Sequence, residues 1–347
     1  MTDGTRRRGA TAAKLRMIST HQDGPVQKTL LALALAVGLP AAAATPPAAP
    51  APAPAATVAT APAAKPAVPL LWKVSDADNS VYLLGSFHLL RAADNPVSPA
   101  VEAAFADAEK VLFEITPEDL ANPANVAKFA EAAKFADGRT LSQALPPETL
   151  ARLKKMLEVS GTPLAQVEGT EPWALTLGMV LGMTQAMGFQ PERGLDKVLM
   201  ARVAEAKKPV AGLETIDAQL QALEGAPLSE QARSLDEFLA DPRKAAEELG
   251  KLHAAWLAGD ADLMDREYRA EMERETPVSY RVMNSDRNAA WVPQLQARLK
   301  APGTDDTLAV VGALHLLGKD GVVERMRAKG YTVERIGVPA GTAAPAR

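Results

Sequence analysis

The tetrapeptide Gly-x-x-His occurs twice in this chain, each time directly after a short apolar run. The first copy ends at His88 and the second at His315, and two leucines follow each histidine. The whole chain has only four histidines, so half of them share one local setting. Imidazole is the commonest metal-binding side chain and the usual proton carrier near neutral pH. The repeated motif therefore predicts that His88 and His315 serve one chemical purpose.

Two glutamates also follow apolar runs that are typical of buried strands. Glu114 comes directly after residues 111–113, and Glu214 comes directly after residues 210–213. Because the carboxyl ends of parallel strands line one edge of an open sheet, we expect these carboxylates and the two imidazoles to converge on one site. Glu214 also precedes a helical stretch, where capping the helix is an equally good explanation of its place.

Two imidazoles with one or two carboxylates form a ligand set for a divalent metal such as Mn²⁺, Co²⁺, Zn²⁺ or Fe²⁺. Such an ion would activate water and polarise a carbonyl or phosphoryl oxygen. His88, Glu114 and His315 are the predicted ligands, and Glu214 is predicted to be a further ligand or a general base. The alternative is that each histidine is an ordinary core residue and that Glu114 pairs with an arginine.

The elements that must position these residues alternate between strands and helices. Alternating apolar residues at 70–74 and the run 81–84 flank a turn, which predicts a hairpin. Further strands are predicted at 110–115, 209–213, 307–311 and 331–336, and helices at 98–108, 146–160 and 236–256. This order predicts an α/β fold with a central, largely parallel sheet, an N-terminal hairpin at an antiparallel edge and a large helical insertion.

The first 44 residues have the pattern of a secretory signal peptide. A basic flank precedes the apolar stretch 29–39, and the small residues 41–44 supply a cleavage site. The apolar stretch is shorter than the roughly 18 residues of a membrane span, so no stable membrane anchor is expected. The chain has no cysteine, which excludes disulfides and a lipid-modified cysteine. These features predict a periplasmic or secreted protein.

The remaining chain divides into three parts by composition. Residues 45–69 are a linker of mostly alanine and proline, residues 70–338 are a single folded domain, and residues 339–347 are a disordered tail. Without residues 1–44 the chain has 32 basic and 40 acidic side chains, a net charge of −8. Because nucleic-acid recognition needs a basic face, nucleic acid is not an expected partner.

Several segments of the folded domain, in this order, resemble the TraB/PrgY/GumN family, which is related to the Tiki metalloproteases. They are residues 71–74, 83–89, 113–114, 171–173, 194–196, 212–215, 287–288, 311–316 and 330–331. The resemblance implies that His88, Glu114 and His315 are active-site residues. It also marks the pair Arg287 and Asn288, whose guanidinium and amide donors suit substrate orientation or stabilisation of an oxyanion.

The function predicted from these features is that of an exported, metal-dependent hydrolase, a peptidase by resemblance, acting on a peptide or protein substrate. The alternative is a non-catalytic periplasmic binding protein that sequesters a peptide or a haem-like ligand in the same site. Family resemblance alone does not separate the two, because one fold supports many functions.

Overall fold

The computed structural model describes residues 65–338 and contains a six-stranded mixed sheet in the order β6-β4-β7-β2-β1-β8. The strands are β1 (Leu71–Ser75), β2 (Ser80–Ser86), β4 (Lys110–Phe113), β6 (Val210–Gly212), β7 (Thr307–Gly312) and β8 (Thr332–Ile336). Strands β6, β4, β7 and β2 run parallel, while β1 is antiparallel to both β2 and β8. The predicted α/β class, parallel core and N-terminal hairpin are confirmed. The hairpin is not an edge, however, because β8 pairs along the outer side of β1.

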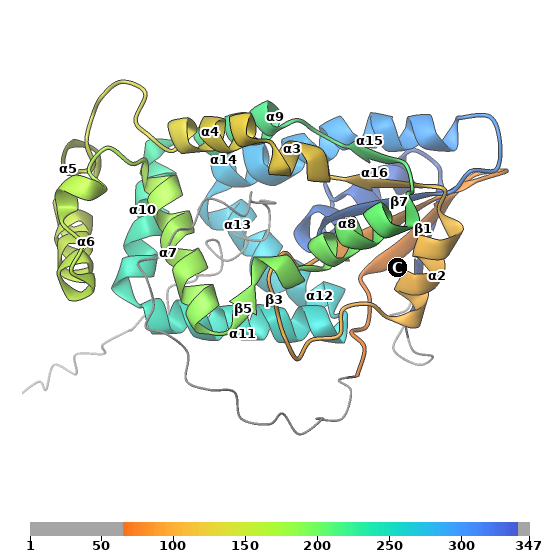
Figure 1. The fold of residues 1–347 in the computed structure, drawn as a ribbon, viewed down its shortest axis with the longest axis horizontal. Coiled ribbons are helices and arrows are strands. Elements are labelled where there is room, and N and C mark those ends of the chain that lie inside the picture. Colours follow the sequence, from red (N-terminus) through yellow and green to blue (C-terminus); the bar gives the residue numbers. More distant parts are fainter. Residues whose placement is uncertain (1–64, 339–347) are drawn as a thin grey trace, which may run out of the picture.

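Most of the chain between β4 and β7 is helical, which is the predicted insertion. Figure 1 shows the sheet at one end of the molecule and helices α5, α6 and α10 at the other. The helices are α2 (Pro99–Asp107), α3 (Pro117–Ala121), α4 (Pro123–Ala132), α5 (Leu141–Ala144), α6 (Pro147–Ser160), α7 (Pro172–Ala186), α8 (Leu195–Ala206), α9 (Ile216–Glu224), α10 (Leu228–Ala240), α11 (Pro242–Ala258), α12 (Ala261–Met264), α13 (Ala270–Glu275), α14 (Pro277–Tyr280), α15 (Asp286–Leu299) and α16 (Val322–Ala328). Two short strands, β3 (Leu90–Arg91) and β5 (Phe189–Gln190), form a separate small sheet.

Capping residues explain where these helices begin and end. The predicted helix at 98–108 is α2, and Ser98 caps it by accepting from the backbone N–H of Val101. The predicted helix at 146–160 is α6, which ends at Gly161 in the left-handed conformation with φ 69°. The single helix predicted over 236–256 is wrong. The helix is interrupted at Asp241, because proline at position 242 has no N–H to donate to a continuing helix. The carboxylate of Asp241 caps the second helix, α11.

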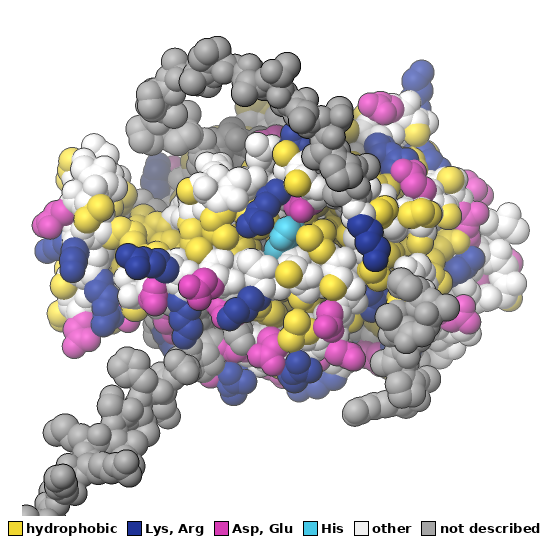
Figure 2. All heavy atoms as spheres, turned by 90° about the horizontal axis from the view of Figure 1, so that it is seen from below, with side chains coloured by type: hydrophobic (Ala, Val, Ile, Leu, Met, Phe, Trp, Pro, Cys, Tyr) yellow, Lys and Arg dark blue, Asp and Glu magenta, His cyan; other side chains and the backbone are white. Residues whose placement is uncertain are grey.

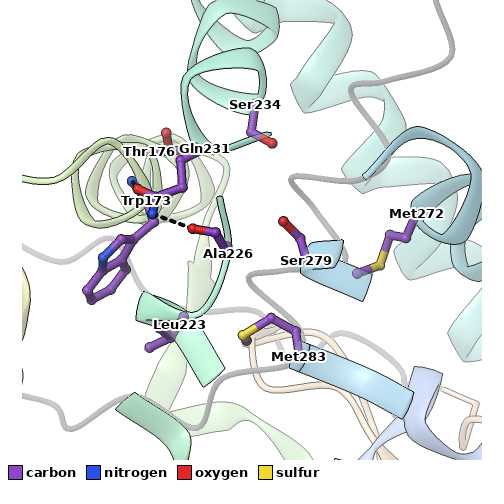
Figure 3. Close-up of a pocket in the computed structure, with 9 residues that line it drawn as sticks. All are labelled: Trp173, Thr176, Leu223, Ala226, Gln231, Ser234, Met272, Ser279 and Met283. Atoms are coloured by element: carbon purple, nitrogen blue, oxygen red, sulfur yellow. Dashed lines mark hydrogen bonds between the residues drawn. The ribbon is translucent and has the colours of Figure 1, made fainter. Parts of the chain in front are cut away.

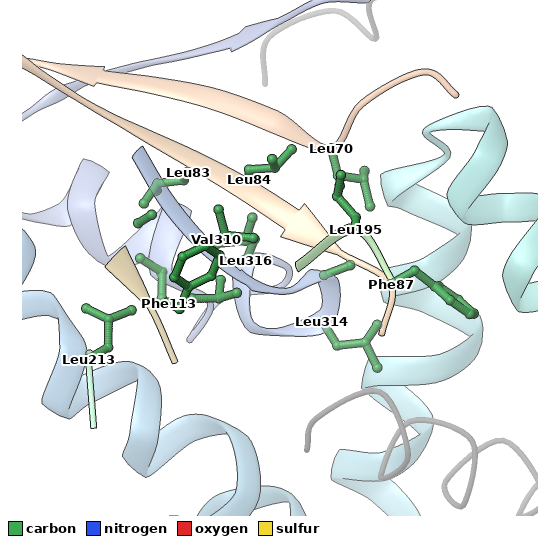
Figure 4. Close-up of a cluster of buried hydrophobic side chains, with 14 of the residues drawn as sticks. Leu70, Leu83, Leu84, Phe87, Phe113, Leu195, Leu213, Val310, Leu314 and Leu316 are labelled. Atoms are coloured by element: carbon green, nitrogen blue, oxygen red, sulfur yellow. The ribbon is translucent and has the colours of Figure 1, made fainter. Parts of the chain in front are cut away.

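The central strands explain why the two Gly-x-x-His motifs leave the sheet at one edge. Every residue of β2 and β7 is buried, as expected for parallel strands covered on both faces. Figure 4 shows leucine, valine and phenylalanine side chains from both strands and their neighbours packed together. The two strands are paired in register up to Ser86 and Gly312. Both motifs therefore begin their turns side by side.

The folded part begins slightly before residue 70. Ala67 is buried and its N–H donates to the carbonyl of Asn95, while the N–H of Val68 donates to the carbonyl of Leu257. Residues 67–69 of the predicted linker thus belong to the packed domain. The predicted signal peptide, the rest of the linker and the predicted tail lie outside the described residues. Among residues 65–338, no helix is long and apolar enough to cross a membrane.

Gly85 tests how tightly the first motif is packed against the second. A Cβ at this position would lie 3.0 Å from Cβ of Leu70 and 3.1 Å from Cα of Ala313. We expect Gly85→Ala to lower the free energy of unfolding in urea by about 1–3 kcal/mol, the usual cost of overpacking. The control is Gly178→Ala in α7, where a Cβ would meet nothing within 4 Å. This control substitution should raise the free energy of unfolding by about 0.5–1 kcal/mol, because alanine is the better helix former. Equal stability of Gly85→Ala and wild type would contradict the packing described.

Candidate functional site

His88 lies just beyond β2 with its two ring nitrogens in different surroundings. Its Nδ1 is 3.1 Å from Oδ1 of Asp196, and its Nε2 is 4.0 Å from Oε1 of Glu114. The contact with Asp196 is an ion pair at close range rather than an aligned hydrogen bond, and neither ring nitrogen has a hydrogen-bond partner among the described residues. The side chain of His88 is 8% exposed. A buried imidazole with one nitrogen open is free to handle a proton or hold a ligand.

The electrostatics of His88 follow from these neighbours. Burial lowers the pKa of His88, but the carboxylates of Asp196 and Glu114 more than offset it, so that the net pKa is raised. For Asp196, burial raises the pKa, yet the charge and hydrogen-bonding effect of His88 leave the net pKa lowered. The two carboxylates therefore stabilise the imidazolium that forms whenever His88 takes up a proton.

His315 is held in the opposite way, with both nitrogens used inside the protein. It lies in the 3₁₀ turn Ala313–Leu316 after β7 and is fully buried. Its Nε2 is 3.1 Å from Nη1 of Arg287, and because a guanidinium can only donate, Nε2 must accept. Its Nδ1 therefore carries the proton and donates to Oδ1 of Asn288 at 2.7 Å. Burial, the charge of Arg287 and then His88 hold the pKa of His315 well below its ordinary value.

Arg287, from α15, is the centre of the site, and all five of its N–H donors are matched. Nε donates to the carboxylate of Glu214 at 3.0 Å, and Nη2 donates to Glu114 at 2.7 Å and again to Glu214 at 2.6 Å. Nη1 donates to the carbonyl of Met283 at 3.0 Å and to Nε2 of His315. The guanidinium could bind a substrate only by giving up one of these bonds.

The two glutamates face this guanidinium from the ends of neighbouring strands. Glu114 accepts from Arg287 through one oxygen and from the N–H of Gly312 through the other, at 2.6 Å. Burial raises the pKa of Glu114, and the charges of Arg287 and then His88 oppose that rise without cancelling it, so that the net pKa is raised. Glu214 also accepts from Nε1 of Trp291 at 3.2 Å. Glu214 does not cap α9, because the hydroxyl of Thr215 does so.

Asn288 also has its polar atoms engaged internally. Its oxygen accepts from His315, and its NH₂ group donates to Oδ1 of Asn284 at 2.8 Å and to the carbonyl of Asp320 at 3.1 Å. In this arrangement Asn288 orients His315 and has no donor left for a substrate. The structure thus brings all six predicted site residues into one network, but it gives Arg287 and Asn288 internal partners.

The predicted metal ligands fit a metal centre only in part. Nε2 of His88 and Oε1 of Glu114 face each other across 4.0 Å, which two ligand bonds of about 2.0–2.2 Å could span. The third predicted ligand, His315, has its lone pair committed to Arg287. Among the residues that the structure describes, no three His, Cys, Asp or Glu side chains are grouped so that they could hold a metal ion. Metal binding stays a prediction, and the chemistry below is derived from the protein's own groups.

Three residues of the site were not predicted as site residues from the sequence: Asp196, Ser86 and Trp291. Asp196 is buried at the first turn of α8, and the hydroxyl of Ser86 donates to it at 2.9 Å. The ring of Trp291 packs against the ring of His315, with the ring centroids 4.6 Å apart and the planes tilted by 48°. Asp196 lies in the segment 194–196, which is one of the segments that resemble the family. An acidic residue at the buried start of a helix was the signal in the sequence that could have identified it as a site residue.

Two cavities of the described residues lie away from His88 and Glu114. One cavity of about 30 Å³, with room for about one water molecule, lies beyond Met283 and is lined by apolar and small polar side chains (Figure 3). A groove of about 960 Å³ runs over α6 and α10, and none of the site residues lines it. The face in Figure 2 shows one histidine side chain reaching the surface between hydrophobic side chains. The described histidines are all buried, and His88 is the most exposed of them.

The fold and the site define an α/β protein in which polar residues from the ends of parallel strands meet around a buried arginine. Residues 70–335 match the TraB/PrgY/gumN family, and the chain belongs to this family. No curated protein and no solved structure matches the chain.

Replacing Arg287 tests whether it holds the site together. We expect Arg287→Met to lower the free energy of unfolding by about 3–5 kcal/mol, because it leaves Glu114 and Glu214 buried without their counter-charge. The control is Arg281→Met, which removes an exposed ion pair with Asp286 and should cost less than about 1 kcal/mol. Similar losses in the two variants, measured by urea denaturation, would show that the buried cation is dispensable.

The neutral state of His315 predicts a pH dependence of stability. Below the unfolded-state pKa of about 6.5, His315 in the unfolded chain takes up a proton while the folded residue does not, so stability falls as the pH falls. In His315→Gln an amide oxygen can replace Nε2 as the acceptor for Arg287. Between pH 7 and 5.5 we expect wild type to lose about 1 kcal/mol more than this variant. His253 and His88 titrate in both proteins, so the difference isolates His315, and equal losses would mean that it is not held neutral.

Proposed function

We propose that this chain is an exported hydrolase that cleaves peptide bonds at the site around His88. The observation that carries the proposal is the open Nε2 of His88, which faces Oε1 of Glu114 across 4.0 Å while Asp196 lies against the other ring nitrogen. A water molecule at an ordinary hydrogen-bond distance of about 2.8 Å from both atoms would fit this spacing. The peptide substrate is inferred from the resemblance to the Tiki proteases.

In the proposed reaction, His88 moves the proton. Oxygen of the bound water attacks the substrate carbonyl carbon while Nε2 takes up a water proton, and Asp196 stabilises the imidazolium that results. The proton then passes from Nε2 to the leaving nitrogen as the C–N bond breaks. Glu114 orients the water through Oε1, and its position beside the imidazolium also favours the charged form. Arg287 and the N–H of Gly312 keep the Glu114 carboxylate in place.

The reaction also needs a hydrogen-bond donor or a positive charge near the developing oxyanion. Arg287 has all its donors engaged, whereas Lys197 follows Asp196 on the first turn of α8 and is only partly buried. Its charge lowers the pKa of His88, an effect smaller than those of Asp196 and Glu114. Burial lowers the pKa of Lys197, opposed by the charges of Asp196 and Glu192. We propose Lys197 for this role.

Whether the hydrolysis needs a bound metal ion is decided by the experiment described below. If an ion binds, His88 and Glu114 are the residues that would hold it, and it would supply an activated water. The export part rests on residues 1–44, which lie outside the described residues. A periplasmic or extracellular site would limit the substrates to peptides and proteins found there.

The deciding experiment uses the chain without residues 1–44, stripped of metal and assayed against a peptide library with and without Mn²⁺, Co²⁺ or Zn²⁺. We expect peptide cleavage that His88→Ala lowers in kcat by at least about 100-fold, the usual minimum for loss of a general base. The control is His253→Gln, which alters the buried histidine that pairs with Asp94 instead and should retain wild-type kcat.

The outcomes of this experiment distinguish metal-free hydrolysis, metal-dependent hydrolysis and binding without hydrolysis. Cleavage that persists in chelator supports proton transfer by His88 without a metal, and cleavage that needs one added ion supports the metal-dependent form. Tight binding of a peptide or haem without turnover under every condition would contradict the proposal and favour the sequestering protein.

A further inference from the structure

Asp196 contacts His88 from a helix start whose position is set independently of the contact. The residue Asp196 is 5% exposed, and its Oδ1 accepts from the hydroxyl of Ser86 at 2.9 Å. The backbone N–H of Asp196 donates back to the same hydroxyl at 3.2 Å. Ser86 is the last residue of β2, so this double contact ties the first turn of α8 to the strand that carries the motif.

The backbone beside this contact is also closely fitted. The N–H of Leu195 donates to the carbonyl of Phe87 at 3.1 Å. A Cβ at Gly194 would lie 2.3 Å from the carbonyl oxygen of His88, so only glycine permits this approach. The backbone segments that carry Asp196 and His88 are therefore held close together by main-chain contacts.

A carboxylate oxygen 3.1 Å from a ring nitrogen decides which nitrogen carries the proton. If Nδ1 were bare, its lone pair would lie close to the negative charge of Asp196, which is repulsive. A proton on Nδ1 removes this repulsion and leaves the lone pair on Nε2, the nitrogen that faces Glu114. Resting on the proposed function, we infer that Asp196 is a positioning residue that sets the Nδ1–H tautomer of His88 and so makes Nε2 the reactive nitrogen.

The other two described histidines show that this arrangement is particular to His88. His315 donates from Nδ1 to a neutral amide, and its Nε2 is taken by Arg287. His253 has Asp94 on its Nε2 at 2.8 Å. Among residues 65–338, only His88 combines a carboxylate beside Nδ1 with an Nε2 that has no hydrogen-bond partner.

The test is ¹⁵N NMR of the histidine rings in the chain without residues 1–44, recorded above the pH at which His88 titrates. The chain then has three histidines, which His→Gln variants assign. In wild type we expect His88 to carry its proton on Nδ1. In Asp196→Ala the ring should shift toward the Nε2–H form, and in Asp196→Asn, whose neutral amide is a weaker acceptor, the shift should be smaller. Asp94→Asn is the matched control and should leave the His88 signals unchanged.

An unchanged His88 tautomer in both Asp196 variants would overturn the inference, and Asp196→Asn alone decides if the alanine variant does not fold. Kinetics supply a separate readout: kcat in Asp196→Ala should fall at least 10-fold with KM little changed, as expected when the base is misoriented. If the tautomer responds as expected but wild type hydrolyses no peptide, the proposed function fails while the positioning role stands.

Discussion

The buried guanidinium of Arg287 is the interaction on which the rest of the site depends. Glu114 and Glu214 leave neighbouring parallel strands at the same edge, so the topology of the sheet forces two carboxylates together in a dry interior. Such a pair is costly unless a cation and hydrogen bonds compensate it. Arg287 supplies both, because its planar fork reaches both glutamates and still has donors left for the carbonyl of Met283 and for His315.

The same cation separates two histidines that look alike in sequence. His315 is kept neutral because one nitrogen accepts from Arg287 and the other donates to Asn288. His88 lies beyond the reach of the guanidinium's hydrogen bonds and is paired with Asp196 instead. The duplicated motif therefore builds two different sites: one histidine supports the network that fixes Glu114, and the other presents an open nitrogen to it.

The sequence predicted the strands and their convergence because buried parallel strands are marked by continuous apolar runs, and polar residues such as His88 and Glu114 stand where those runs end. It did not predict the pairings. The roles of Arg287 and Asn288 depend on how α15 packs against the sheet, where it contacts β2, and nothing local encodes that contact. For Glu214, the local sequence fitted a helix cap as well as a site residue. The structure excludes the capping role, because Thr215 caps α9. Asp196 was overlooked because its partner is distant in sequence.

The most direct measurement is a crystal structure of the protein grown with Mn²⁺ or Zn²⁺ in excess. The account predicts that the guanidinium of Arg287 stays within hydrogen-bond distance of Glu114, Glu214 and His315, and that any bound ion lies between His88 and Glu114. An ion held jointly by His88, Glu114 and His315, with Arg287 displaced from His315, would contradict it.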